Sequence, residues 1–223
     1  MSDLTRGDSG AASEERRAAS EISRRAVHIS GASLPLLYLL ELVTWRQLRY
    51  VMIVVAAAVV VLEFLRVGVG LNHPLYDHLT REYEQDAVAG YAYYILGMAT
   101  VALLFGPGVT IPAMVMLAVG DPISGALGDN GPHEHKRPAV VAAMFGVCFL
   151  LAVPFTVAWS DAPVGAAAAA GGALLAAIAD GIKPIVRGVA VDDNLTMPLA
   201  AAAGIAGVFW LLGVGTGFDP FWL

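Results

Sequence analysis

The sequence predicts an all-α membrane protein whose helices form a polytopic bundle. Of the 223 residues, 57% are hydrophobic and 14% are charged, whereas soluble domains carry about 25% charged residues. The mean hydropathy is +0.68. Seven apolar segments approach or exceed the ~17–25 residues of a membrane-spanning helix, namely 26–43, 49–67, 87–106, 109–128, 138–158, 163–182 and 196–215. These observations exclude a soluble globular domain and predict about seven transmembrane helices.

The chain is expected to contain one folded domain. Residues 1–23 are rich in Ser, Glu, Arg and Gly and lack an apolar stretch, so we interpret them as a disordered cytoplasmic tail and not as a cleavable signal peptide. Residues 24–223 then form a single integral membrane domain. The single cysteine, Cys148, excludes an intramolecular disulfide.

Positive charge is distributed unequally between the two sides of the predicted membrane. Of the thirteen Lys and Arg residues, only Arg46 and Arg49 fall on one side, and the rest lie in the N-terminal tail and the loops of the other side. Cytoplasmic loops of membrane proteins carry the excess of Lys and Arg. We therefore expect a multi-pass protein of the cell membrane with a cytoplasmic N-terminus and its polar chemistry on the cytoplasmic face.

Two polar groups occur in the first two segments. Arg24, Arg25 and His28 are three or four residues apart and can share one helical face. They could bind a phosphate, or they could be an ordinary positive anchor at the membrane surface. Glu63 lies inside the second apolar run, three residues before Arg66. An intramembrane carboxylate is either functional or paired, and both interpretations remain open here.

The loop after the second segment mixes acids and bases in the sequence HLTREYEQ. It is compatible with a short interfacial helix. Arg81, Glu82 and Glu84 would face either water or a substrate.

The end of the fourth segment holds an aspartate where lipid would be expected. Gly120-Asp121-Pro122 interrupts the apolar run. Proline removes an amide donor and disfavours helical geometry at the preceding residue. Broken helices at membrane depth occur where they are buried or line a cavity. We therefore expect a helix break here, with Asp121 facing a polar pocket.

Glycines and a basic pair follow this aspartate. Gly125, Gly128 and Gly131 recur at every third position, and Lys136 and Arg137 come next. Side-chain-free positions let backbone amides approach an anion, although such spacing is also typical of close helix packing. With the acid, the group indicates a site for a metal ion and a polyphosphate.

A second acidic site flanks the last predicted helix. Asp180 ends the sixth segment, and Asp192–Asn194 stand at the entrance to the seventh. Asn194 is a candidate helix cap. Carboxylate oxygens are the ligands that Mg²⁺ prefers. Asp121 could share one ion with Asp180 or Asp193, provided that helices four, six and seven are neighbours.

The order of the motifs RRAVH, EFLR, GDPISGALG with HKR, and DDNLTMPL resembles the dolichol kinase and phytol kinase family of membrane lipid kinases. The resemblance covers about residues 24–200. It implies phosphoryl transfer to the hydroxyl of an isoprenoid alcohol, such as dolichol, polyprenol, phytol or geranylgeraniol, with CTP as the usual donor. By position, the family motifs fall on Arg24, Arg25 and His28; Glu63 and Arg66; Gly120, Asp121, Ser124, Gly128, His135, Lys136 and Arg137; and Asp193, Asn194 and Pro198.

The sequence departs from the family pattern after the basic pair. Val140, Val141 and Ala142 stand where the family has Glu, Gly and Ser, and Asp180 replaces a second family Glu. We expect Asp121 and Asp180 to hold Mg²⁺, Asp193 to accept the alcohol proton, and the bilayer, the alcohol and the nucleotide to be the partners, with no nucleic acid or protein partner. The alternatives are a CTP-dependent phospholipid cytidylyltransferase, a membrane transporter, or a weakened family member with a binding role.

Overall fold

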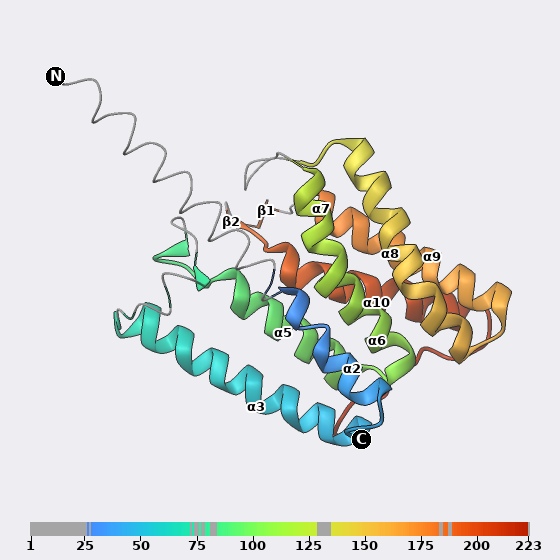
Figure 1. Ribbon diagram of the computed structural model, residues 1–223, viewed down its shortest axis with the longest axis horizontal. Helices are drawn as coiled ribbons and strands as arrows, with labels where there is room; N and C mark the ends of the chain where they lie inside the picture. The colour runs from blue at the N-terminus through green and yellow to red at the C-terminus, as the bar shows by residue number, and fades with distance from the viewer. Residues whose placement is uncertain are drawn as a thin grey trace.

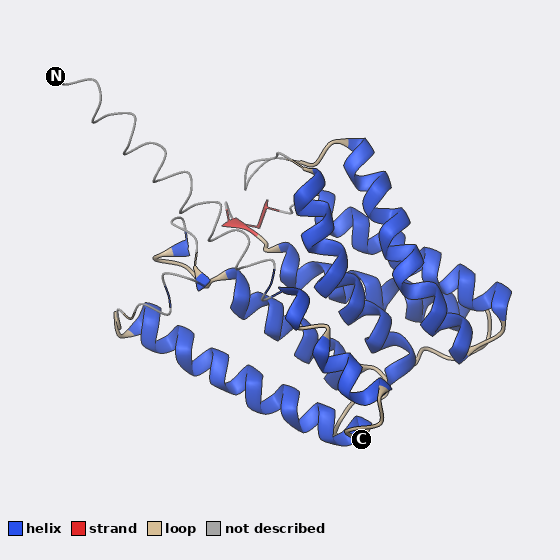
Figure 2. Cartoon of the chain, in the orientation of Figure 1, coloured by secondary structure: helices blue, strands red, loops and turns tan. Residues whose placement is uncertain are grey.

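The computed structural model describes residues 26, 28–71, 73, 76, 79–80, 84–128, 135–182, 185–186 and 189–222. Figures 1 and 2 show a bundle of helices joined by short loops. The helices are α2 (Ser33–Leu39), α3 (Trp45–Glu63), η1 (Phe64–Gly68), α5 (Gly90–Leu104), α6 (Pro107–Val115), η3 (Met116–Gly120), α7 (Asp121–Leu127), α8 (Pro138–Trp159), α9 (Ala162–Gly181) and α10 (Asp193–Leu211). A two-stranded antiparallel ribbon, β1 (Ile185–Val186) and β2 (Val189–Ala190), joins α9 to α10. The predicted all-α membrane bundle is confirmed.

Five of the described helical spans are long and apolar enough to cross a membrane. They are Trp45–Gly68, Pro107–Leu127, Pro138–Trp159, Ala162–Gly181 and Asp193–Leu211. The helix α5 is apolar but shorter, and the first predicted segment contributes the short helix α2. Orientation in the membrane and the total of seven crossings stay predictions.

The span α6–η3–α7 is the central element of the bundle. Its residues from Gly108 to Met114 are all buried, as are Met116 and Leu117. The helices α8 and α10 both pack against it. A helix that is buried on every side has apolar residues all round and no polar face. The sequence of this span from Pro107 to Gly120 shows that pattern.

Small residues set the close spacing of α9 and α10. A Cβ atom placed on Gly204 would lie 2.4 Å from the carbonyl oxygen of Gly171. In the same contact, a Cβ on Gly172 would lie 2.5 Å from Ile205 Cγ1. Membrane helices associate through such small residues because lipid supplies no hydrophobic driving force between them. The spacing places the end of α9 beside the start of α10.

The predicted break at Pro122 is wrong. Gly120 and Asp121 both keep right-handed helical dihedral angles, and the chain passes from η3 into α7 without a gap. Because Pro122 has no amide hydrogen to donate, the preceding turn widens into a π-helix instead of breaking. Such π segments are frequent at functional sites, and this one ends at Asp121.

Candidate functional site

Three aspartates converge at one end of the bundle. Asp121 opens α7, Asp180 lies in the last turn of α9, and Asp193 is the first residue of α10. One carboxylate oxygen from each lies within 4.8 Å of the others. Asp180 is fully buried, and the other two side chains are partly buried. The prediction that Asp121 lies close to Asp180 and Asp193 is therefore confirmed.

The helix ends explain why these side chains meet. The close contact of α9 with α10 brings Asp180 next to the start of α10. Asp192 is the N-cap of α10, and its Oδ1 accepts a hydrogen bond of 2.9 Å from the amide of Asn194. This cap fixes the first turn, in which Asp193 lies. The prediction that Asn194 caps this helix is wrong, because Asp192 takes that position.

Lys136 and Ser124 hold the buried Asp180. Lys136 Nζ donates to Asp180 Oδ1 at 2.6 Å and to Ser124 Oγ at 2.9 Å, and Ser124 Oγ donates to Asp180 Oδ2 at 2.6 Å. The amide of Lys136 also donates to the carbonyl oxygen of Gly181 at 3.1 Å. The basic loop before α8 is therefore attached to the end of α9 by both its backbone and its side chain.

His28 approaches the cluster from the first segment. Its Nδ1 lies 3.2 Å from Asp121 Oδ2 but makes no hydrogen bond of normal geometry, so the attraction is electrostatic and requires a protonated ring. The imidazole packs 4.3 Å from the ring of Tyr94, whose hydroxyl donates to the His28 carbonyl at 2.8 Å. A Cβ on Gly31 would lie 1.9 Å from that hydroxyl. Gly31 thus permits the contact that positions His28.

Glu63 and Arg66 form the intrahelical pair that one interpretation predicted, with a separation of 2.7 Å. Arg66 also donates to the carbonyl oxygens of Glu84, Gln85 and Ala87. Glu63 accepts from the amide of Ala89 and from the hydroxyl of Tyr91. The network joins the end of α3 to the start of α5.

Glu84, which the sequence placed on a short helix facing water or a substrate, is buried in the structure. Its side chain is 5% exposed, and its Oε1 accepts a hydrogen bond of 3.3 Å from the amide of Gly90. A Cβ on Gly90 would lie 3.3 Å from Asn194 Nδ2 and 3.7 Å from Asp192 Oδ2. Asn194 is also buried, and its Oδ1 has no hydrogen-bond partner among the described residues. Gly90 leaves room for the side chains of Glu84, Asp192 and Asn194. It is the one feature of the sequence that could have indicated this contact.

The remaining predicted residues divide into four groups. Gly125 lies inside α7, and Gly128 is extended at its C-cap, so these two glycines do not form the expected anion-binding loop. Gly120 packs against Met144 and Cys148, and Pro198 packs against Gly97. His135 and Arg137 lie in the short segment before α8. Five predicted positions, Arg24, Arg25, Arg81, Glu82 and Gly131, lie outside the described residues.

The comparisons with known proteins add no relative to this description. The chain matches no protein-family model, and no curated protein and no solved structure is significantly similar to it.

Proposed function

We propose that the protein is a membrane-embedded kinase that transfers a phosphoryl group from a nucleoside triphosphate to the hydroxyl of an isoprenoid alcohol. The observation that carries the proposal is the convergence of Asp121, Asp180 and Asp193 beside Lys136 at one end of an apolar bundle. Phosphoryl transfer requires mainly positioning and charge stabilisation. An apolar bundle with one polar end suits a substrate that is a hydrocarbon with one reactive hydroxyl.

The donor set fits a magnesium ion. Mg²⁺ binds oxygen ligands at about 2.0–2.1 Å, so opposite ligands of one ion lie about 4.2 Å apart. One oxygen from each of the three aspartates lies within 4.8 Å of the other two, a spacing comparable with this largest separation between two ligands of one ion. Asp121 and Asp180 would hold the ion, which neutralises phosphate charge when bound. Carboxylate ligands and donor phosphates together form the usual magnesium site of kinases.

The protein side chains then have distinct roles. The alcohol oxygen attacks the γ-phosphorus, the bond from that phosphorus to the bridging oxygen breaks, and the nucleoside diphosphate leaves. Asp193 accepts the proton of the alcohol. Lys136 and Arg137 attract the phosphates of the donor, for which CTP is the expected nucleotide. His28 adds positive charge beside Asp121 when it is protonated.

The decisive experiment uses full-length protein in lipid nanodiscs with CTP, Mg²⁺ and geranylgeraniol. We expect phosphorylated alcohol and CDP as products. Asp121→Asn keeps the size of the side chain but removes its charge, and we expect transfer to fall by about 10²–10³-fold. Asp86→Asn is the matched control, because Asp86 is an exposed aspartate in the loop before α5, and its activity should equal that of the wild type.

Three outcomes would contradict the proposal. Transfer that is unchanged in Asp121→Asn would remove this residue from the site. Release of pyrophosphate with a phosphatidic acid substrate would identify a cytidylyltransferase. The absence of transfer to any alcohol, with ion-dependent uptake into vesicles, would identify a transporter.

A further inference from the structure

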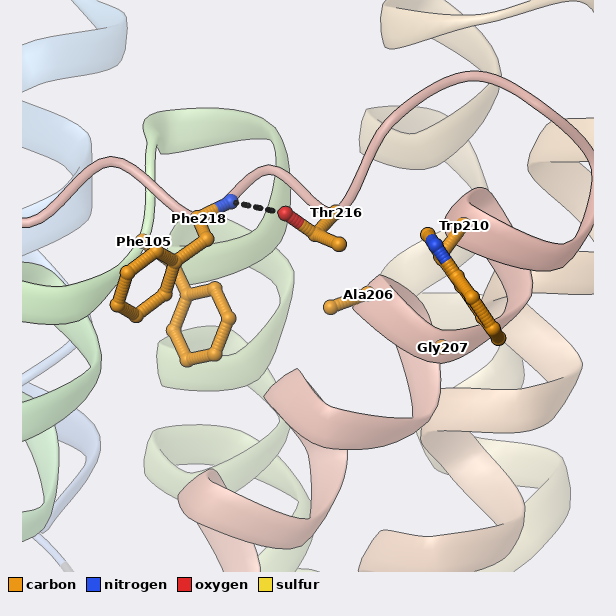
Figure 3. A pocket seen from close by; sticks show the side chains of 6 residues that line it. All are labelled: Phe105, Ala206, Gly207, Trp210, Thr216 and Phe218. Carbon is orange, nitrogen blue, oxygen red and sulfur yellow. Dashed lines mark hydrogen bonds between the residues drawn. The ribbon is translucent and has the colours of Figure 1, made fainter.

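An apolar pocket of about 400 Å³ lies at the end of the bundle opposite the three aspartates. Its lining residues are Phe105, Ala206, Gly207, Trp210, Thr216 and Phe218. Figure 3 shows the rings of Phe105 and Phe218 on one side and Trp210 on the other, with Ala206 between them. The pocket is therefore bounded by the end of α5, the last turns of α10 and the C-terminal segment.

The pocket exists because α5 and α10 are close at one end and separate at the other. Near the aspartates, a Cβ on Gly97 of α5 would lie 2.6 Å from the carbonyl oxygen of Asn194 and 2.9 Å from Pro198 Cγ. Near the pocket, a Cβ on Gly207 of α10 would have no atom within 4 Å. The two helices run in the same direction from this contact, so a wedge opens between them.

One face of α10 connects the pocket with Asp193. Asp193, Thr196, Ala200, Ala203 and Gly207 recur every three or four residues and share this face. The side chains between the two ends are small, and Ala203 is exposed. At a rise of 1.5 Å per residue, the fourteen residue steps from Asp193 to Gly207 span about 21 Å. That length is about two thirds of the ~30 Å hydrocarbon core of a bilayer.

We propose that this pocket binds the distal end of the substrate's isoprenoid tail and sets a minimum chain length. The inference rests on the proposed function, because it places the reacting hydroxyl at Asp193. A tail that starts there and follows the small-residue face of α10 reaches Gly207 after about 21 Å. Geraniol is too short for this path, whereas geranylgeraniol and longer alcohols reach the pocket.

The physical basis of selection is packing. Lipid tails are as apolar as the pocket, so transfer from the bilayer gains little hydrophobic free energy. Contacts with the rings of Phe105, Phe218 and Trp210 supply dispersion energy that a short tail lacks. The discrimination between alcohols should therefore be moderate, of the order expected for a few added methylene groups in an apolar site.

The test fills the pocket without disturbing the helix. Gly207→Leu places a side chain in open space and improves helix propensity. We expect its kcat/KM for geranylgeraniol to fall about tenfold, with the value for geraniol within about twofold of wild type. Gly146→Leu is the matched control, since a Cβ on Gly146 of α8 also meets nothing within 4 Å. An equal ratio between the two alcohols in Gly207→Leu and wild type would overturn the proposal.

A binding measurement separates this inference from the kinase proposal. Full-length protein in phosphatidylcholine nanodiscs is photolabelled with geranylgeraniol that carries a diazirine at its distal end. We expect label on Gly207–Trp210 or Thr216–Phe218, competition by unlabelled geranylgeraniol, and loss of label in Gly207→Leu. Label at these positions without any phosphoryl transfer would support the pocket and reject the kinase. Label elsewhere, displacement by excess phospholipid, or protection by a second copy of the chain would reject the pocket.

Discussion

Both ends of the bundle bury a cation, but the two cations have different kinds of partner. At one end, Lys136 bonds to the fully buried Asp180, which lies with Asp121 and Asp193. At the other end, Arg49 donates to the backbone carbonyls of Ala102 and Phe105 and to Asp219, whose carboxylate is largely exposed. The carbonyls are those left unpaired at the end of α5.

The difference separates a structural clamp from a candidate reaction site. The Arg49 contacts satisfy the last carbonyls of a helix and hold the C-terminal segment, whose Asp219 and Phe221 amides also donate to the carbonyls of Leu104 and Leu103 at the end of α5. At this end, the described acidic side chain near Arg49 is Asp219, which Arg49 neutralises. The Lys136 contacts leave three carboxylates from three helices together, and that arrangement costs folding free energy unless a cationic ligand accompanies it.

The largest effect is expected from Asp180→Ala, which leaves Lys136 buried without its carboxylate. Breaking a buried pair on one side costs about 3–5 kcal/mol of unfolding free energy. Thermal unfolding in detergent measures the loss. In the double variant with Lys136→Met, we expect stability to return while phosphoryl transfer stays absent. A single variant as stable as wild type would contradict the buried pair.

Arg49→Met tests the opposite end. Hydrogen bonds to charged groups contribute about 1.5–3 kcal/mol, so we expect stability to fall by about that amount while the folded protein keeps its transfer activity. Hydrogen exchange at the Asp219 amide should also increase, since that amide bonds to Leu104. A variant with normal stability but reduced transfer would show that this end takes part in the reaction.

Asp192→Ala removes the cap of α10 and tests how Asp193 is positioned. Losing an N-cap side chain costs about 0.5–2 kcal/mol. We expect transfer to fall by more than this stability loss explains, because the first turn of α10 holds Asp193. Asp192→Asn retains a capping oxygen and serves as the control, with both quantities near wild type. Equal rates of transfer in both variants and in wild type would show that the Asp192 cap does not position Asp193 for the reaction.

The smallest effect is expected from Tyr94→Phe. The change keeps the ring beside His28 and removes one hydrogen bond to the His28 carbonyl, which is worth about 0.5–1.5 kcal/mol. We expect a reduction of a few-fold in transfer, measured with saturating alcohol. Tyr38→Phe, on a partly buried tyrosine of α2, is the control. A larger loss in the control than in Tyr94→Phe would contradict the role given to this contact.

The helices were largely predictable because the bilayer imposes length and apolarity on them. The predicted segment 138–158 is observed as Pro138–Trp159, and 163–182 as Ala162–Gly181. The first segment was less predictable. The sequence predicted one long helix over 26–43, whereas the structure has a turn near Gly31 followed by the short α2. The tight contact of Gly31 with Tyr94 lies at this turn, and a tertiary contact leaves no local pattern in sequence.

The sequence predicted which residues make up the candidate site, but it predicted their proximity only on the condition that the helices carrying them are neighbours. The acids at 121, 180 and 193 stood out because charges are costly in apolar segments, but their meeting depends on the contact of α9 with α10. The widened turn at η3 replaced the expected break because a helix can absorb one missing donor without stopping. The sequence could not distinguish Glu84 from the other charged residues of its segment, since its burial depends on Gly90 and α10.

The most direct test of the account is whether Asp121 and Asp180 hold one cation beside Asp193. Mn²⁺ accepts the same carboxylate ligands as Mg²⁺, and its binding to full-length protein can be followed by electron paramagnetic resonance. We expect one site that Mg²⁺ displaces and that weakens strongly in Asp121→Asn, with Asp86→Asn unchanged. Binding of equal affinity in wild type and Asp121→Asn would contradict the metal site and the kinase proposal built on it.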